Sequence, residues 1–587
     1  MKDNTPHHWF GEYTGDKITG LFVPELNLGL QPTAPFAVGD IVWVSDSPTL
    51  FAPSESALNQ ILRVLARYKL DPSHPPEVVH AANAYLDIDF LADPTLVNLT
   101  HLPFVTIDNP DSRDLDQAVY VNRVGSGYEV HYALADAAWF VPSGSALFEE
   151  ALLRGVTYYA PDFSVRMLPA VLSENLISLN QGVERRAMVF RINLDSSGEV
   201  TSTQVERAII RSRAKLSYTE VQQLYDHHDN NGNRPTAPGE WDESLLAMRK
   251  VGELRIADAR RRDVVEFNRR EAQVIIDPDD HRKLTIVVRE RNDAEKYNEQ
   301  ISLLCNIEGA RILQSHQPVN ADLQAVYRVH KPPMAMRLDD FRATLQELIN
   351  HYELDGRFQW QPTDSLADYI AGLPTEDKYS AIRQTIERMA MLTNRASTFE
   401  AEPDQHFALG VDAYARFSSP MREVVGIFTH KELYESLGVA TAQQNEVDSE
   451  LRIRVIERAN EAKSLQRKLE KEFQLLALDS FLNEDLQTPE RERAWHTGVI
   501  VGMRTNRIYL HIEGLALDIK VYLEDLNQTY DANYHLDGIR AEPGPPGYDP
   551  VSLQSAPVLV IGQRLKAQVS TLEPHRRRYL FNLAIVR

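Results

Sequence analysis

Hydrophobic and polar positions alternate strictly in the last hundred residues. GVIVGMRTNRIYLHIEG (498–514) and LALDIKVYLEDL (515–526) both follow a period of two, with Ile508, Leu510 and Ile512 on one face. VLVIGQRLKAQVSTLEPHRRRYLFNLAIV adds two or three strands, with three arginines at a turn, and EPGPPGYDP (542–550) reads as a surface loop. The pattern predicts an all-β domain over 489–587.

The middle of the chain mixes two periods. Apolar runs at 128–137 and 186–194 predict strands, whereas 295–314 and the charged stretch 451–482 repeat at helical spacing. Cys305 falls in the apolar stripe of the first helix, which favours core packing over reactivity. We therefore expect a mixed αβ domain over 91–488.

The first ninety residues predict a small helical, winged-helix-like domain. One strand at 37–46 precedes helices at 54–70 and 77–88, and the prolines of DPSHPP separate the helices. A helix-turn-helix of this kind serves either packing or RNA contact; five Lys and Arg against eleven Asp and Glu favour packing. The fold class is thus α+β multidomain, with boundaries at 1–90, 91–488 and 489–587.

Composition excludes several classes of protein. The 587 residues are 43% hydrophobic and 25% charged, which is typical of a globular protein and excludes a disordered chain. A single cysteine excludes a disulfide scaffold and fits a reducing cytoplasm. No apolar run is long enough to span a membrane. We also expect the protein to be a monomer. The net charge of −22 argues against coating nucleic acid by bulk electrostatics, yet residues 491–587 carry twelve basic and ten acidic residues. That local balance fits an OB-fold barrel that grips single strands, or a plain β-barrel.

Candidate chemistry concentrates in FVTIDNPDSRDLDQAVYV (104–121). Between two apolar strands stand Asp108, Asp111, Asp114 and Asp116, and so many carboxylates there are costly unless cations compensate them. Oxygen ligands alone favour Mg²⁺ or Mn²⁺ over zinc, and such sites most often serve phosphoryl transfer. A solvated acidic turn is the alternative.

These residues carry a resemblance to a known family. TIDNPDSRDLDQAVY closely resembles the signature TIDGEDARDFDDAVY of the ribonuclease II/ribonuclease R (RNB) exoribonucleases, and FSSPMREVVGIFTHKEL (417–433) resembles their TSPIRRYPDLLVHR. The stretches 139–179 and 290–300 follow in the same order. The resemblance covers about 90–485, and the C-terminal region is similar to the ribosomal S-one-type OB domain that ends these enzymes.

The resemblance implies a metal site. Asp108, Asp114 and Asp116 match three of the four aspartates that hold the family's catalytic magnesium, and Gln117 stands at the fourth position. A carboxamide oxygen can ligate but brings no charge. Either one metal site is weakened or Asp111 partly substitutes.

The resemblance also implies substrate contacts. Arg422 matches the phosphate-holding arginine, although Glu423 to Gly426 depart from the family pattern. Glu470 matches a glutamate near the catalytic centre, with a solvated helix charge as the alternative. A structural ion pair is the alternative for Arg422. The contacts to the RNA end are implied at Tyr159, Phe267 and Glu299, where the aromatic rings would stack on bases unless they belong to the core.

The expected function is a processive 3′→5′ exoribonuclease that releases nucleoside 5′-monophosphates from single-stranded RNA. The absence of two N-terminal cold-shock domains and of a lysine-rich tail favours ribonuclease II-like stalling at duplexes. Three alternatives remain: a catalytically impaired RNA-binding member, an acidic scaffold that contacts protein, and ribonuclease R-like degradation of structured RNA.

Overall fold

The computed structural model describes residues 8–30, 35–230, 239–265, 270–316, 323–438, 445–544, 556–576 and 578–586. The chain forms two compact units. The first holds residues 1–262, 291–331 and 397–471, and the second holds 263–290, 332–396 and 472–587. These units cut across the three regions expected from the sequence, whose boundaries stay predictions.

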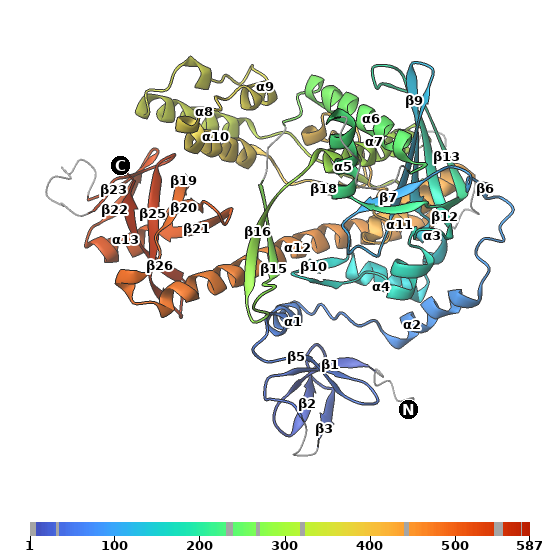
Figure 1. The fold of residues 1–587 in the computed structure, drawn as a ribbon, viewed down its shortest axis with the longest axis horizontal. Helices are drawn as coiled ribbons and strands as arrows, with labels where there is room; N and C mark the ends of the chain where they lie inside the picture. The colour runs from blue at the N-terminus through green and yellow to red at the C-terminus, as the bar shows by residue number, and fades with distance from the viewer. Residues whose placement is uncertain are drawn as a thin grey trace. The chain divides into compact units, whose positions relative to one another are not determined.

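The first unit is built on a seven-stranded sheet in the order β14-β7-β8-β9-β12-β13-β6 (Figure 1). Its strands are β6 (Val97–Asn98), β7 (Val105–Asp108), β8 (Gln117–Val124), β9 (Gly127–Ala135), β12 (Glu184–Leu194), β13 (Val200–Arg211) and β14 (Ala214–Ser217). The central pairs are antiparallel, whereas β14 runs parallel to β7, with Ser217 opposite Asp108. The strands predicted at 128–137 and 186–194 are confirmed.

Both faces of this sheet are buried, because successive side chains of a strand point to opposite faces. Ala118, Ala133 and Val189 lie in one hydrophobic cluster, and their neighbours Val119 and Leu134 lie in the other. This explains why the sequences of the central strands are nearly continuous apolar runs.

Helices cover the two faces. The elements that contribute to the first cluster are α2 (Pro76–Asn83), α3 (Ala137–Phe140), α4 (Ala146–Arg154), the π-helical turn η2 (Val171–Leu176), α11 (Val424–Ser436) and α12 (Asn445–Gln487). Those of the second are α5 (Tyr218–Asn230), α6 (Asp242–Arg261) and α7 (Asp293–His316), of which α6 and α7 pack together. The helices predicted at 295–314 and 451–482 are confirmed as α7 and α12, and Cys305 is fully buried.

The N-terminal region requires a correction. Its two predicted helices form as α1 (Ala57–Arg67), capped by Ser56, and α2, but a five-stranded sheet precedes them. The strands are β1 (Trp9–Tyr13), β2 (Lys17–Gly20), β3 (Asn27–Gly29), β4 (Ile41–Val44) and β5 (Thr49–Ala52), in the order β3-β2-β1-β4-β5. The prediction of a helical, winged-helix-like domain was wrong because strands of three to five residues are too short to show a clear alternation. Gly11 lies in the middle of β1, where a Cβ atom would lie 2.2 Å from the Ile18 side chain on β2.

Short elements complete the first unit. They are η1 (Ala84–Asp87), β10 (Tyr158–Ala160), β11 (Phe163–Val165), β17 (Tyr327–Val329), β18 (Thr398–Glu400) and η5 (Phe407–Leu409). Of these, β10 carries Tyr159 and pairs with β11.

The second unit contains a mainly β region where the sequence predicted an all-β domain. Its five-stranded sheet has the order β21-β20-β19-β25-β26, the same connectivity as the N-terminal sheet, and β22-β23-β24 form a second sheet. The elements are β19 (His496–Arg504), β20 (Arg507–Ile512), β21 (Leu517–Tyr522), α13 (Leu523–Tyr530), β22 (Tyr534–Asp537), β23 (Arg540–Pro543), β24 (Leu559–Val560), β25 (Arg564–Glu573) and β26 (Arg578–Ile585). Ile508, Leu510 and Ile512 are buried as predicted, and α13 was not foreseen. Most of the loop predicted at 542–550 lies outside the described residues.

A hairpin and a group of helices complete the second unit. They are β15 (Arg270–Ile276), β16 (Leu284–Glu290), α8 (Ala335–His351), η3 (Gly356–Phe358), α9 (Leu366–Ala371), η4 (Asp377–Tyr379), α10 (Ser380–Thr393) and η6 (Glu490–Glu492). No helix in the described part of the chain is both long and apolar enough to cross a membrane.

Candidate active site

The acidic loop connects two strands at the edge where their buried segments end. Asp108 closes β7 and Gln117 opens β8, so the aspartates lie where the sheet stops and the loop begins. Lys215 on the adjacent β14 donates through Nζ to the carbonyl oxygens of Pro110, at 2.8 Å, and of Ser112, at 2.5 Å. The loop is therefore held by contacts to its backbone, which leaves carboxylates to carry the chemistry.

Asp116 is the most buried of these carboxylates. It is 2% exposed, its Oδ1 accepts the Met421 N–H at 2.9 Å, and its Oδ2 lies 2.5 Å from Nε of Arg422. Burial raises the pKa of Asp116 to about 6, although Arg422 opposes the shift. The contact joins two sequence-predicted site residues that lie 306 positions apart.

Asp114 and Asp108 complete the loop. Burial also raises the pKa of Asp114, with Arg422 again opposing and Asp108 reinforcing the shift. Oδ1 of Asp108 accepts hydrogen bonds from the Asn109 N–H and the Ser112 hydroxyl. The raised pKa values show that Arg422 does not fully compensate the negative charge of these two desolvated carboxylates. A hard cation, which prefers oxygen ligands, fits this set of donors.

Several ionisable groups of the site act on the pKa of Arg422. Burial alone would lower its pKa, but Asp116, Tyr159, Asp108 and Asp114 outweigh that effect and raise it well above its usual value. Its backbone carbonyl accepts the Thr157 N–H at 2.9 Å, and Val424 N–H donates to Gly155 at 2.9 Å. This short pairing places the segment before Tyr159 beside Arg422.

Tyr159 and Glu470 come together through a residue that the sequence did not indicate. Gln466 on α12 bridges the backbone of Tyr159, accepting its N–H at 3.1 Å and donating to its carbonyl oxygen at 3.2 Å. The same Gln466 donates to Glu470 at 3.1 Å. Tyr159 is 47% exposed, and its partial burial raises its pKa to about 12. An open ring beside an arginine is suited to contact a base.

The remaining residues predicted to contact the substrate are Glu299 and Phe267. Glu299 on α7 forms an ion pair with Arg291 at 3.0 Å, and its neighbour Asn298 lies 3.4 Å from the hydroxyl of Tyr218. Burial raises the pKa of Tyr218 and Asp108 adds to the shift, so this end of α7 faces the loop. Phe267 lies outside the described residues.

Gln117 has well-defined partners. Its Nε2 donates to the carbonyl oxygen of Ser418 at 2.5 Å, and its Oε1 accepts the hydroxyl of Tyr132. The side chain therefore links β8, β9 and the loop before Arg422.

A second group of carboxylates lies elsewhere in the first unit. Among the described residues, Glu432, Glu435 and Asp448 are the one set whose ligand atoms all lie within 4.8 Å of one another. Lys431 Nζ contacts all three, at 3.0, 3.0 and 2.9 Å. An internal ammonium group thus compensates part of the charge of this set.

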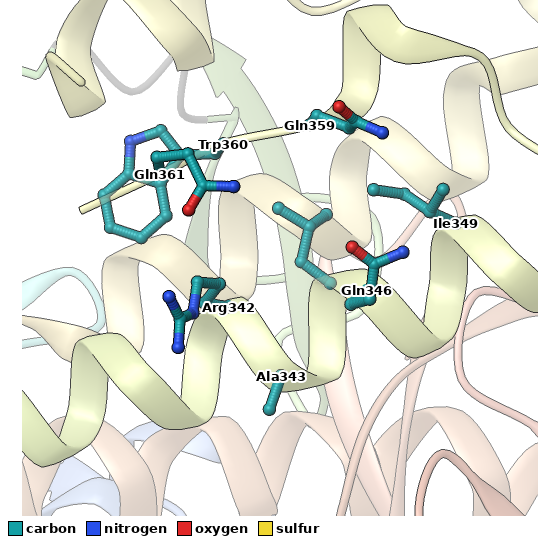
Figure 2. Close-up of a pocket in the computed structure, with 8 residues that line it drawn as sticks. Arg342, Ala343, Gln346, Ile349, Gln359, Trp360 and Gln361 are labelled. Atoms are coloured by element: carbon teal, nitrogen blue, oxygen red, sulfur yellow. The ribbon is translucent and has the colours of Figure 1, made fainter. Parts of the chain in front are cut away.

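The second unit contains a pocket of about 360 Å³ beside α8 (Figure 2). Its lining includes Arg342, three glutamines and Trp360 but no carboxylate, histidine or cysteine. It therefore lacks the groups needed for acid–base or metal chemistry, and the described candidate site residues all belong to the first unit.

Comparison with known proteins agrees with the sequence resemblance. Residues 96–438 match the RNB domain model. Ribonuclease R of Vibrio parahaemolyticus serotype O3:K6 is 34% identical over 342 residues, which cover 57% of this chain and 39% of the relative. The chain thus matches less than half the length of that relative.

Solved structures share the fold. Mycoplasma genitalium RNase R in complex with ribose methylated single-stranded RNA superimposes with a TM-score of 0.78 at 20% identity, over 99% of this chain and 90% of the other. The same protein in complex with double-stranded RNA gives 0.73 at 19% identity, over 99% and 96%. A mixed αβ fold for the middle of the chain is therefore confirmed.

Proposed function

The chain belongs to the RNB domain family, and from that premise we propose that it is a processive 3′→5′ exoribonuclease. It would hydrolyse single-stranded RNA to nucleoside 5′-monophosphates. The observation that supports this most strongly is the pairing of Asp116 with Arg422, which brings the acidic loop and the expected phosphate-holding arginine to one place.

Asp108, Asp114 and Asp116 would hold the divalent cation, Mg²⁺ or Mn²⁺. When bound, such a cation stabilises charge on phosphate oxygens and provides a nucleophile at neutral pH. Its charge would also lower the raised pKa values of Asp114 and Asp116 and so favour the ionised carboxylates.

Arg422 would bind the scissile phosphate. Its guanidinium forms an ion pair with Asp116, so a phosphate would share or replace that carboxylate as its partner. Tyr159 would stack on a terminal base, Glu299 would orient the RNA end, and Glu470 would act through its contact with Gln466. Phe267 keeps its proposed stacking role from the resemblance alone.

The five-stranded sheet of the second unit would be the OB-fold that binds the strand. Arg578 stacks on Tyr522, with its guanidinium carbon 3.7 Å from the ring centroid, and Glu524 pairs with Arg576 at 3.0 Å. These pairs engage two of the three arginines that the sequence places at a turn.

A second candidate function is degradation of structured RNA. The names of the relatives favour it, because they are ribonuclease R proteins and one structure contains double-stranded RNA. Stalling at duplexes stays a prediction.

One experiment separates these readings. The protein is incubated with Mg²⁺ and a hairpin that carries a single-stranded 3′ tail, and the products are resolved by gel and by chromatography. Nucleoside 5′-monophosphates and a residual hairpin with a short tail are the expected result. Complete digestion of the stem would replace the ribonuclease II-like reading with the ribonuclease R-like one. Binding without any product would contradict the exoribonuclease.

A further inference from the structure

We propose that Gln117 is a positioning residue that ties the start of β8 to the loop carrying Arg422, and that it does not act as a cation ligand. The inference rests on the proposed function only where it assigns the phosphate to Arg422. The hydrogen bonds that carry it belong to the protein alone.

The two ends of the Gln117 amide have different partners. Its nitrogen donates to the Ser418 carbonyl oxygen at 2.5 Å, and its oxygen accepts the Tyr132 hydroxyl. Because a carbonyl oxygen can only accept, this position needs a donor that an ionised carboxylate lacks. The partners therefore select an amide over the aspartate that the family pattern has here.

The loop that receives this bond is closely held. Asn306 is fully buried, and its Oδ1 accepts the N–H groups of Phe417 at 2.8 Å and Ser418 at 3.2 Å. Its Nδ2 donates to the Ser418 hydroxyl at 2.9 Å. Gln117 supplies the bond to the carbonyl oxygen of Ser418, so the N–H, the hydroxyl and the carbonyl oxygen of that residue all have partners.

The bond lies close to the chemistry at both ends. Gln117 follows Asp116 in sequence, and Ser418 lies four residues before Arg422, which binds Asp116. Gln117 thus adds a third connection between the acidic loop and the arginine loop, beside the two that Asp116 makes with Met421 and Arg422. Loss of the amide bond would release one of these three connections and let the guanidinium shift, and small displacements of a substrate-binding group have large effects.

The test uses two variants of Gln117 and a matched control. Gln117→Met keeps the length without hydrogen bonds or charge, and Gln117→Glu keeps the shape but loses the donor. Asn460→Asp is the control, because the Asn460 amide likewise accepts at one end and donates at the other, in its case to the N–H and carbonyl of Phe399, at 2.8 and 2.9 Å. Three quantities are measured: the melting temperature, the affinity for a ribose-methylated single-stranded RNA by anisotropy, and the affinity for Mn²⁺ by electron paramagnetic resonance.

Both Gln117 variants should weaken RNA binding about fivefold or more, the range expected when a buried polar group loses its partner. Mn²⁺ affinity of Gln117→Met should remain within about twofold of the wild type. Asn460→Asp should lower the melting temperature while RNA affinity is retained.

Two outcomes would overturn the inference. A clear loss of Mn²⁺ affinity in Gln117→Met, together with a gain in Gln117→Glu, would make Gln117 a ligand. A fall in melting temperature like that of the control, with RNA affinity unchanged, would make it merely structural. None of these measurements requires cleavage, so a wild type that binds RNA but releases no nucleotides would contradict the proposed function while the role of Gln117 is still decided.

Discussion

Two groups of carboxylates in the first unit are built in opposite ways. Glu432, Glu435 and Asp448 are gathered within 4.8 Å around the ammonium group of Lys431. The aspartates of the loop at 108–116 are spread along the loop, and Arg422 forms an ion pair with one of them, Asp116. The tighter group is the one that supplies a cation of its own, so closeness of carboxylates does not by itself mark a metal site.

Burial affects the two groups alike, but its consequence differs. It raises the pKa of Asp116 to about 6 and that of Glu432 to about 7. At Glu432 the nearby Lys431 opposes the shift, and the same Lys431 joins α11 to α12 through its ion pair with Asp448. At the loop the proposed divalent cation would stabilise the ionised carboxylates.

The largest expected effect is a difference in the rate of RNA cleavage between variants of the two carboxylate groups. Asp114→Asn should lower the rate of RNA cleavage by on the order of 10²–10³-fold, because the change removes charge that would hold the cation and the transition state. Glu435→Gln, a matched loss of charge in the other group, should leave the rate within about twofold. Equal losses in the two variants would break the comparison.

Replacing the internal cation tests the second group directly. Lys431→Met should cost about 3–5 kcal/mol of unfolding free energy, because it leaves buried carboxylates without their partner. Added Ca²⁺ should recover part of that loss in the variant and have a smaller effect on the wild type. Denaturant titration with and without Ca²⁺ measures both, and an unchanged stability would show that Lys431 does not compensate the group.

The neighbourhood of the loop should bind bases, and the other group should not. Tyr159→Ala is expected to cost about 1–3 kcal/mol of RNA affinity through lost stacking, whereas Tyr159→Phe should retain most of it. Titration of labelled single-stranded RNA provides the measurement. Equal losses in the two variants would point to the hydroxyl instead of the ring.

The smallest effect is a pH dependence of stability. Because the pKa of Glu432 rises from 4.5 to about 7 on folding, the folded protein holds a proton that the unfolded chain has released within this window. The stability from this group is fully present below pH 4.5 and is lost as the pH rises through 7. Glu432→Gln should therefore reduce the decline in unfolding free energy from pH 5 to pH 8 by roughly 1–3 kcal/mol, measured by denaturant titration. An unchanged slope would assign the decline to other groups.

Local patterns predicted much of this molecule. The acidic loop lies between the strands expected for it, because FVTI and AVYV are apolar runs whose environment is set by neighbours in the sequence. The long helix α12 and the buried Cys305 followed from helical spacing. Of the N-terminal strands, only β4 was expected, within the strand predicted at 37–46; the other four were missed because each is too short to show its period.

Contacts between distant segments had no such signal. Arg422 could be assigned only through the family resemblance, since nothing local connects it with Asp116. Lys215, Asn306 and Gln466 were missed because each acts on backbone atoms of a distant segment, and any sequence can present those atoms. The amide pairing of Gln117 explains a departure from the family pattern that the sequence left open.

The most direct test of the central claim is a time course on a 5′-labelled single-stranded RNA with Mg²⁺, comparing wild type with Asp116→Asn. The account predicts that full-length RNA passes directly to a short 5′ end product in the wild type and stays intact in the variant. Intact RNA with the wild type, despite binding in a gel shift, or equal cleavage by both proteins would contradict it.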